Sequence, residues 1–422
     1  MKHLLSFLIL IAALSVQAQD TLTVVQYNLL NYGNITGFCS ASVNSVDAKD
    51  NYLIRITDYL EPDIFSVNEM GKSVEFHDRI LNNVFNRDGL TRYARISVPN
   101  IANSEIVNMI YYNTDKVRFH SLAVAQSVTR DIDVVKFYYN SSSLSQGDTV
   151  FLHCIVAHLK AGEGSSNVLA RTTMVLNTMN FLQSGYQPGN FLVMGDFNLY
   201  SPTEGAFIAL TQAYAPTWVF NDPADRVGEW HSNSSFSDVH TQSTHTTGGC
   251  AASGGMDDRF DFILASTAVM EGTHCMKYVP GTYMALGQDG NHYNKALTDA
   301  PALSLENELV QALYSNSDHL PVVMKLEVDE SMAVPESTAI ESLHVVNPAD
   351  DQVKMMCRLV RQSVLDVKLY NMMGALVTTH RFDVPSGSSV LSLSVGQLPQ
   401  GIYLISLTEE NGHKLTRKVF VK

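Results

Sequence analysis

The sequence has few cysteines, few charged residues and few long apolar runs. Its 422 residues include 5 cysteines; 17% are charged and 45% are hydrophobic. This composition is typical of a globular protein and excludes an extended disordered chain. Beyond the first 16 residues no stretch approaches the about 20 apolar residues that a membrane-spanning helix needs, so we predict no stable membrane insertion. The length predicts two or three domains.

Several kinds of chemistry lack their sequence signatures. The cysteines match no zinc-ligand spacing, and the chain has neither a Ser-containing nucleophile elbow nor a Gly-rich phosphate loop. The formal net charge is −14, so the composition offers no broad basic surface for nucleic acid. A nucleic-acid substrate is weakened but not excluded, because a bound metal or a local cation patch can be sufficient.

The N-terminus predicts export. Lys2 and His3 precede an apolar run at residues 4–16, and the small-residue sequence VQA follows. We therefore predict a signal peptide at residues 1–18. No cysteine follows the run closely, so we expect no lipoprotein anchor.

An exported chain can form disulfides. We expect Cys250 and Cys275 to pair, because they flank one strand-like segment, and such a loop would add on the order of 3 kcal/mol. Cys154 lies inside an apolar run and is expected to be a small buried residue. Cys39 and Cys357 have no predicted partner.

Two structural regions are predicted. Residues 21–328 alternate strand-like runs such as TLTVVQYNLL with amphipathic helices such as NVLARTTMVLNTMNFL, which predicts an α+β fold of two packed mixed sheets flanked by helices. Residues 329–342 are polar and read as a linker. Residues 343–422 contain short strands broken by Gly, Pro and Asn, which predicts a small β-sandwich.

The segment VMGDFNLYSP raises the question of function, since Asp196 and Asn198 follow a short apolar run. Turn residues after a strand are common, but with period two both side chains could also face one ligand. Similar polar groups stand at other predicted strand ends. The full set is Asn28, Glu69, Glu105, His158, Asp196, Asn198, Asp261, Asp318 and His319.

Each of these residues alone could be a locally satisfied polar group. Together they offer what hydrolysis of a phosphate ester requires: oxygen ligands for a divalent cation, a group that orients water, and donors to the phosphate. Glu69, Asp318, Asp196 and Asn28 offer oxygen ligands that suit Mg²⁺, with Mn²⁺ as an alternative. The two histidines suit proton transfer near neutral pH.

With these residues, the segment 22–328 resembles the endonuclease/exonuclease/phosphatase superfamily, whose members have a four-layer α/β-sandwich. GDFN and SDHLPV carry the resemblance, together with the first-strand Asn28 and Glu69. Two residues depart from the usual pattern: Asn68 stands where Gln is usual, and Tyr27 stands where Trp is usual. The strand histidine, His158, favours the secreted deoxyribonuclease-like branch.

The resemblance implies Mg²⁺-dependent hydrolysis of phosphodiesters, with DNA or RNA as the substrate, by a monomer. It implies that Glu69, Asp318 and Asn28 hold the metal. It also implies that Asp196 orients water and Asn198 holds a phosphate oxygen. In this view Glu105 orients His158, and Asp261 orients His319.

Some lipid phosphodiesterases of the superfamily also carry the strand histidine, so a phospholipid or inositol phosphate substrate is the alternative. Cleavage at a membrane would require exposed apolar loops. The polar segment 216–255 contains Trp218, Phe220, Trp230 and Phe236, but these are spread among polar residues, so this alternative ranks second.

The same segment contains His240 and His245, which could serve a second metal site or contact substrate. Its many Ser and Thr residues favour a solvated loop instead. A structural Ca²⁺ held by Asp257 or Asp258 is a further possibility.

The C-terminal region resembles the sorting domain of type IX secretion cargo. VVNPADDQVKM, VKLYNMMGALV and LPQGIYLISLTEENGHKLTRKVFVK carry this resemblance. It implies contact with the type IX secretion machinery and passage from the periplasm to the cell surface or beyond, with cleavage expected in the linker. A sugar-binding β-sandwich is the alternative.

Overall fold

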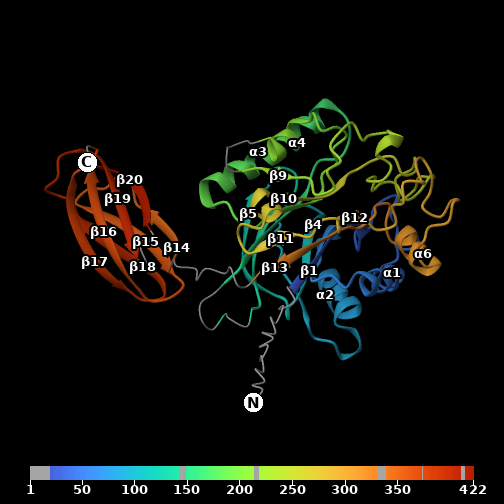
Figure 1. The fold of residues 1–422 in the computed structure, drawn as a ribbon, viewed down its shortest axis with the longest axis horizontal. Helices are drawn as coiled ribbons and strands as arrows, with labels where there is room; N and C mark the ends of the chain where they lie inside the picture. Colours follow the sequence, from blue (N-terminus) through green and yellow to red (C-terminus); the bar gives the residue numbers. More distant parts are fainter. Residues whose placement is uncertain are drawn as a thin grey trace, which may run out of the picture. The chain divides into compact units, whose positions relative to one another are not determined.

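The computed structural model describes residues 20–141, 144, 149–212, 218–329, 339–372, 374–409 and 414–422. The chain forms two compact units, of which the first comprises residues 1–142 and 150–333 and the second comprises residues 143–149 and 334–422 (Figure 1). The predicted signal peptide and most of the predicted linker lie outside the described residues.

The first sheet of the first unit is mixed, with strand order β11-β13-β1-β2-β4-β3 and β12 beside β13. The long strand β1 is parallel to β2 and antiparallel to β13. The strands are β1 (Asp20–Tyr32), β2 (Ile64–Gly71), β3 (Tyr93–Arg95), β4 (Ile106–Asn113), β11 (Met276–Tyr278), β12 (Met284–Ala285) and β13 (Val322–Val328).

The second sheet has the order β5-β6-β7-β8-β10-β9. Here β7 and β8 are parallel, while β10 runs antiparallel to β8. The strands are β5 (Val117–Gln126), β6 (Ile132–Tyr139), β7 (Phe151–His158), β8 (Phe191–Asp196), β9 (Phe220–Asn221) and β10 (Asp261–Ser266).

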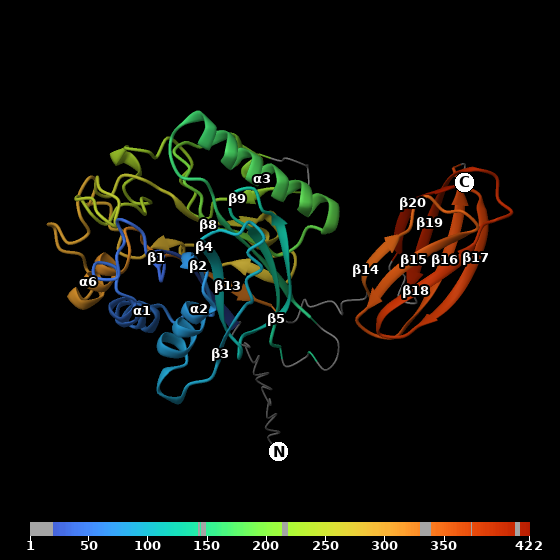
Figure 2. The same ribbon diagram turned by 180° about the vertical axis from the view of Figure 1, so that it is seen from behind.

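Helices cover the outer faces of the two sheets. In Figures 1 and 2, α1, α2 and α6 lie on the side of the first sheet, and α3 and α4 lie on the side of the second. The helices are α1 (Val46–Leu60), α2 (Val74–Ile80), α3 (Ser165–Gly185), α4 (Gly205–Thr211), α5 (Thr267–Glu271) and α6 (Asn307–Asn316), with the short turns η1 (Leu81–Phe85), η2 (Arg87–Gly89) and η4 (Ser234–Phe236).

Alternation along β7 shows how the layers are built. Leu152, Cys154 and Val156 belong to the core between the sheets, whereas Ile155 and Ala157 belong to the core beneath α3 and α4. Successive strand residues point to opposite faces, so one apolar strand serves both cores. The predicted layered α/β-sandwich is therefore confirmed, and Cys154 is buried as expected.

The end of β8 requires glycine. Gly195 has φ +150°, and a Cβ atom there would lie 1.7 Å from the carbonyl oxygen of Ala157 on β7. Only glycine allows the two strands to come this close. This contact fixes the backbone directly before Asp196.

The segment after residue 217 is packed, so the expectation of a solvated loop is wrong for much of it. Trp218, Phe220 and Trp230 are buried, and His240 is fully enclosed. The indole Nε1 of Trp230 donates to the Leu199 carbonyl at 2.9 Å, and its carbonyl lies 2.7 Å from Nε2 of His240. Aromatic residues therefore anchor this segment to the end of β8.

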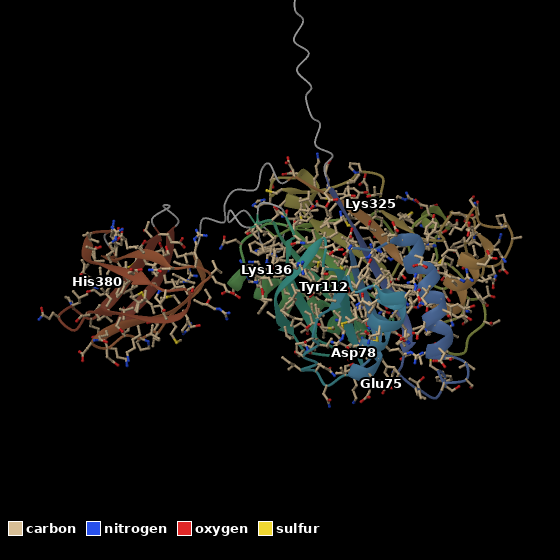
Figure 3. The ribbon with its side chains drawn as sticks, turned by 90° about the horizontal axis from the view of Figure 1, so that it is seen from below. Glu75, Asp78, Tyr112, Lys136, Lys325 and His380 are labelled. Atoms are coloured by element: carbon tan, nitrogen blue, oxygen red, sulfur yellow. A yellow bond between two sulfur atoms is a disulfide. The ribbon has the colours of Figure 1, made fainter. Side chains whose placement is uncertain are left out.

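The second unit is the predicted β-sandwich. Its sheets have the orders β14-β15-β18 and β17-β16-β19-β20. Exposed and buried residues alternate strictly along β15, as in a strand with one face on a core. Figure 3 draws its side chains, among them His380 on β17. The strands are β14 (Ile340–Val345), β15 (Gln352–Leu359), β16 (Ser363–Asn371), β17 (Leu376–Val384), β18 (Gly387–Ser394), β19 (Gly401–Glu409) and β20 (Lys414–Val421).

Candidate active site

Three predicted site residues form one row on the second sheet. His158 pairs in register with Asp196 across β7 and β8, and Asp261 on β10 pairs with Asp196 from the other side. On each strand, the residue two positions further inside belongs to the core between the sheets. The period of two therefore points this polar row into the same space, at the open end of that core.

The first sheet contributes Asn28 and Glu69 through an irregularity. The register between β1 and β2 shifts after Asn28, and Glu69 has φ 58°. Such a bulge redirects a side chain, and left-handed backbone at a bulky residue is characteristic of functional sites. The Asn28 amide donates to Asp196 Oδ2 at 2.9 Å and to Glu69 Oε1 at 3.2 Å. Asn28 thus joins the carboxylates of the two sheets.

The segment SDH between α6 and β13 closes the row. Ser317 Oγ donates to the Asn28 carbonyl at 2.7 Å and accepts from the His319 backbone N–H at 3.1 Å. The His319 Nδ1 lies 2.6 Å from Asp261 Oδ2, while its Nε2 lies 3.8 Å from Asp196 Oδ2. Asp261 and His319, which are 58 residues apart, therefore form a buried pair.

Glu105 does not join this cluster, and the expectation that it orients His158 is wrong. Its carboxylate lies 2.7 Å from Lys72 Nζ, and its side chain is 68% exposed. Glu105 precedes β4, where the pairing with the end of β2 turns it toward Lys72 and solvent. His158 Nε2 instead lies 3.5 Å from Asp196 Oδ2 and 3.8 Å from Glu69 Oε1.

Asn198 lies beside the row. Its backbone N–H donates to Asp196 Oδ1 at 3.0 Å, and its amide Nδ2 lies 3.4 Å from the Leu159 carbonyl. With φ 49° it turns the chain directly after β8. Asn198 therefore shapes the turn that carries Asp196.

The two histidines differ in charge. Burial and the nearby Arg130 guanidinium hold the pKa of His158 well below its ordinary value. Burial also opposes the charge of His319, but the Asp261 carboxylate outweighs it and holds the pKa of His319 well above the ordinary value. Burial raises the pKa of Asp196 to about 7, against the opposing charge of His319. A neutral and a cationic imidazole thus face one carboxyl group.

Buried amides tie the row to both sheets. The side-chain Oδ1 of Asn68 accepts from the Asp196 backbone N–H at 2.8 Å and from Gln26 Nε2 at 2.7 Å. The Asn68 amide donates to Asn108 Oδ1 at 2.7 Å, and Asn108 donates to the Val156 carbonyl at 3.2 Å. Polar residues inside apolar strands, as in IVNMIYY, were the sequence signal for this network.

Sequence reasoning also missed two cations. Arg130 donates to the Leu159 carbonyl at 3.1 Å. Burial lowers the pKa of Arg130, and the nearby charges of Glu69 and Asp196 oppose this shift. Lys49 on α1 donates to the Leu29 carbonyl at 2.7 Å and to the Asn316 carbonyl at the end of α6. Burial lowers the pKa of Lys49 to about 7. In the sequence both residues look like ordinary surface charges.

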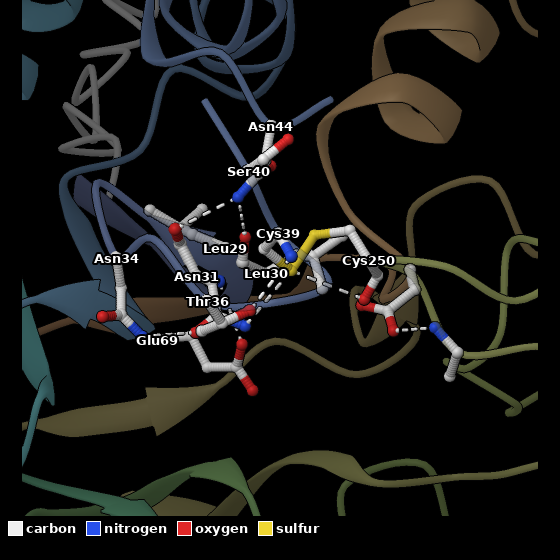
Figure 4. The surroundings of a disulfide bond; sticks show 12 residues. Leu29, Leu30, Asn31, Asn34, Thr36, Cys39, Ser40, Asn44, Glu69 and Cys250 are labelled. Carbon is white, nitrogen blue, oxygen red and sulfur yellow. Dashed lines mark hydrogen bonds between the residues drawn. A yellow bond between two sulfur atoms is a disulfide. The ribbon is translucent and has the colours of Figure 1, made fainter. Parts of the chain in front are cut away.

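The disulfide joins Cys39 to Cys250, so the predicted pair of Cys250 and Cys275 is wrong (Figure 4). Cys39 and Cys250 are 211 residues apart, but the fold brings their Cα atoms to 4.5 Å. Cys275 instead leads into β11, where its carbonyl accepts from the Asp329 backbone N–H at 2.9 Å. Proximity in sequence was therefore a poor guide to the pairing.

The chain near each half of this disulfide contacts a carboxylate of the site. The Asn31 backbone N–H donates to Glu69 Oε2 at 2.9 Å, as Figure 4 shows beside Cys39. On the other side, the Ala252 backbone N–H donates to Asp318 Oδ2 at 2.8 Å. The disulfide thus joins the loop that follows Asn31 to the loop that contains Ala252, next to the groups that orient two predicted metal ligands.

The donor set fits a hard divalent cation. Ligand atoms of Glu69, His158 and Asp196 lie within 4.8 Å of one another. Asp318 Oδ1 is buried without a hydrogen-bond partner among the described residues. Oxygen-rich sites with one or two carboxylates suit Mg²⁺. Glu69, His158 and Asp196 are the residues whose spacing fits a cation, whereas Asp318, the second predicted carboxylate ligand, lies outside this group.

Comparison with known protein families identifies the second unit. Residues 347–422 match the family described as "Secretion system C-terminal sorting domain". The C-terminal resemblance is therefore confirmed, and the chain is exported to the cell surface or the extracellular space. Among the described residues no helix is long and apolar enough to cross a membrane.

Similar solved structures include proteins of the endonuclease/exonuclease/phosphatase family. One from Bacteroides thetaiotaomicron is 16% identical and covers 74% of this chain and 99% of its own, with a TM-score of 0.44. One from Beutenbergia cavernae is 14% identical and covers 95% of this chain and 100% of its own, with a TM-score of 0.39. TDP2 of D. rerio, complexed with a single-strand DNA product, is 11% identical and covers 74% of this chain and 100% of its own, with a TM-score of 0.46. No curated protein matches the chain.

Proposed function

We propose that this exported chain is a divalent-cation-dependent phosphodiesterase that hydrolyses nucleic acid, with DNA as the first substrate and Mg²⁺ as the cation. One observation carries the proposal: at one end of the core, both sheets contribute to a buried cluster of three carboxylates and two histidines. The carboxylates are Glu69, Asp196 and Asp318. Such a set combines metal ligation with proton transfer, as phosphodiester hydrolysis requires.

In this proposal each side chain has a separate task. Glu69 and Asp318 hold the cation, and Asn28 keeps the carboxylates of Glu69 and Asp196 at a fixed spacing. When bound, Mg²⁺ supplies charge stabilisation to the phosphoryl oxygens.

Asp196 orients the attacking water and accepts its proton. It lies at the centre of the cluster, 3.5 Å from His158 Nε2 and 3.8 Å from His319 Nε2. A carboxylate placed between two imidazoles is suited to this exchange. His319, cationic beside Asp261, donates to the phosphate. Asn198 contributes a further contact to a phosphate oxygen.

A lipid substrate is the second candidate, and two observations bear on it in opposite directions. The aromatic residues Trp218 and Trp230, which would have to insert into a membrane, are buried. The loop after β1, however, exposes Ile35, Phe38 and Val43 by 72%, 78% and 68%. This loop carries Cys39 and follows β1, whose Asn31 contacts Glu69, so these apolar side chains belong to a segment that leads away from the site.

The substrate is tested by incubating the purified protein with plasmid DNA and with phospholipid vesicles, each with and without EDTA. We expect EDTA-sensitive cleavage of DNA and none of phospholipid. Cleavage of vesicles with DNA left intact would replace the proposal by the lipid alternative. In that case Phe38→Ser should weaken binding to vesicles, because it removes an exposed apolar anchor.

The histidines are tested by substitution. His158→Ala and His319→Ala should each lower kcat for DNA by at least about 10²-fold, because His319 donates to the phosphate and His158 contacts Asp196, the group that accepts the proton. His274→Ala is the matched control, since His274 is exposed on the loop between α5 and β11 and outside the cluster. Near-normal rates for both variants would contradict the assignment.

A further inference from the structure

A second histidine–carboxylate pair lies outside the cluster described above. His231 Nδ1 lies 2.5 Å from Asp258 Oδ1, and the His231 side chain is 36% exposed. Among the described residues its Nε2 has no hydrogen-bond partner. The imidazole is therefore fixed at one nitrogen and presents the other at the surface.

The backbone around this pair is held firmly. The preceding residue, Trp230, is buried and anchored to Leu199, three residues after Asp196. The Ser232 backbone N–H donates to the Asp257 carbonyl at 2.9 Å. His231 thus stands on a rigid support next to the segment that leaves β8.

One residue connects this pair to the candidate active site. The Gln242 backbone exchanges hydrogen bonds with Asp258 at 2.9 and 3.0 Å. The Gln242 side-chain amide lies 2.7 Å from His319 Nε2 and 3.4 Å from Asp318 Oδ2. Gln242 therefore links the loop segment of Asp258, the partner of His231, to the imidazole of His319.

Tyr200 packs against the histidine of this pair. It follows Asp196 by four residues, and its ring packs edge-on against His231 with centroids 5.1 Å apart. Phe260 supports the same ring from another side at 5.0 Å. Burial and the charges of Asp258 and Asp196 raise the pKa of Tyr200 to about 12, so its hydroxyl stays neutral. The tyrosine orients the imidazole without adding charge.

The local charges favour an imidazolium. Burial alone lowers the pKa of His231, but the Asp258 carboxylate, aided by Glu163 and Asp257, raises it above the ordinary value. In a chain of net charge −14, a partly exposed cation at this position can contact an anionic ligand. A polynucleotide carries a phosphate at every residue, and such phosphates are contacted by positioned cations.

We propose that His231 binds a phosphate group of the polynucleotide next to the one that is cleaved, with Asp258 and Tyr200 holding its imidazole in place. This subsite rests on the proposed nuclease function. It gives the enzyme a preference for chains over single phosphodiesters, because only a chain occupies both positions.

Kinetics with a short single-stranded oligonucleotide test the subsite. His231→Gln removes the charge while keeping a polar side chain of similar size, so KM should rise about fivefold to tenfold with kcat changed less than about twofold. The salt dependence of binding should also weaken, with the slope of log K against log salt reduced by about one. Asp258→Asn should shift KM in the same direction. The exposed His274→Gln is the control.

A KM and salt slope equal to those of the wild-type protein would overturn the proposal and leave a purely structural pair. Direct binding separates this result from failure of the proposed function. The affinity of wild-type and His231→Gln protein for a labelled oligonucleotide is measured in EDTA, where no cleavage occurs. Weaker binding by the variant supports the subsite even if the wild-type chain cleaves no DNA, whereas equal binding or none refutes it.

Discussion

Removing the Cys39–Cys250 disulfide should both destabilise the first unit and loosen the candidate metal site. The bond joins residues separated by 211 positions. In the chain-entropy model, a loop of that length restricts the unfolded chain by about 5 kcal/mol. The double variant Cys39→Ala with Cys250→Ala should therefore lose about 3–5 kcal/mol of the free energy of unfolding, within the range found for native disulfides.

The same variant should bind Mg²⁺ more weakly. The loops released by the change are the one that follows Asn31 at the end of β1 and the one that contains Ala252, and the backbone N–H groups of these two residues orient Glu69 and Asp318. A ligand whose orienting hydrogen bond is loosened typically loses about 10-fold or more in metal affinity. The effect on affinity should exceed that on kcat at saturating Mg²⁺.

Two assays separate these effects. Urea unfolding monitored by tryptophan fluorescence reports the stability of the first unit, which contains both tryptophans. The Mg²⁺-dependent rise in melting temperature reports affinity. Cys275→Ala is the matched control, because Cys275 is a thiol in the structure. A loss of less than about 1 kcal/mol, or Mg²⁺ affinity equal to that of the control, would refute the reasoning.

Three further predictions address folding and secretion. Asp222→Ala should cost about 3–5 kcal/mol, measured by urea unfolding, because it strands the buried guanidinium of Arg259, which lies 2.7 Å from Asp222. Burial opposes the charge of Asp222, but the Arg259 guanidinium outweighs it and lowers the pKa of Asp222. The stability that this ion pair contributes is therefore present above about pH 4 and is lost as pH falls through the lowered pKa. A free energy of unfolding that stays unchanged down to about pH 2 would contradict this. Gly195→Ala should cost about 3 kcal/mol or more in the same assay because its Cβ would meet the Ala157 carbonyl, whereas Gly185→Ala, with open space at its Cβ, should have little effect. Deletion from Glu341 onward should leave kcat unchanged, because the last strand of the first unit, β13, ends before it, but should trap the chain in the periplasm; surface export of the deletion variant, seen by cell fractionation, would contradict this.

The sequence predicted the layers of the fold because strand and helix periods are local properties. The alternation in VFLHCIVAH and the apolar spacing in NVLARTTMVLNTMNFL are readable without a structure. The C-terminal sandwich followed from strand and turn spacing in the same way. The row of His158, Asp196 and Asp261 could also be anticipated, since each stands at the polar end of an apolar run.

Contacts that depend on register or on loop packing could not be read from the sequence. Glu105 has the residue type expected for a partner of His158, but the pairing of β4 with β2 turns it toward Lys72. The disulfide partner Cys39 lies 211 residues from Cys250, and only the completed fold brings the two together. His231 stood in a segment whose composition suggested solvent exposure, while buried aromatic residues hold it in place.

The most direct test of the central claim is the rate of plasmid DNA hydrolysis by the purified chain, first in EDTA and then after addition of excess Mg²⁺. Asp196→Asn serves as the matched variant, because it keeps the shape of the side chain that lies between both histidines. The proposal predicts no cleavage in EDTA, cleavage restored by Mg²⁺ in the wild-type protein, and a loss of at least about 10²-fold in the variant. Cleavage that persists in EDTA, or that is equally fast in the variant, would contradict the account.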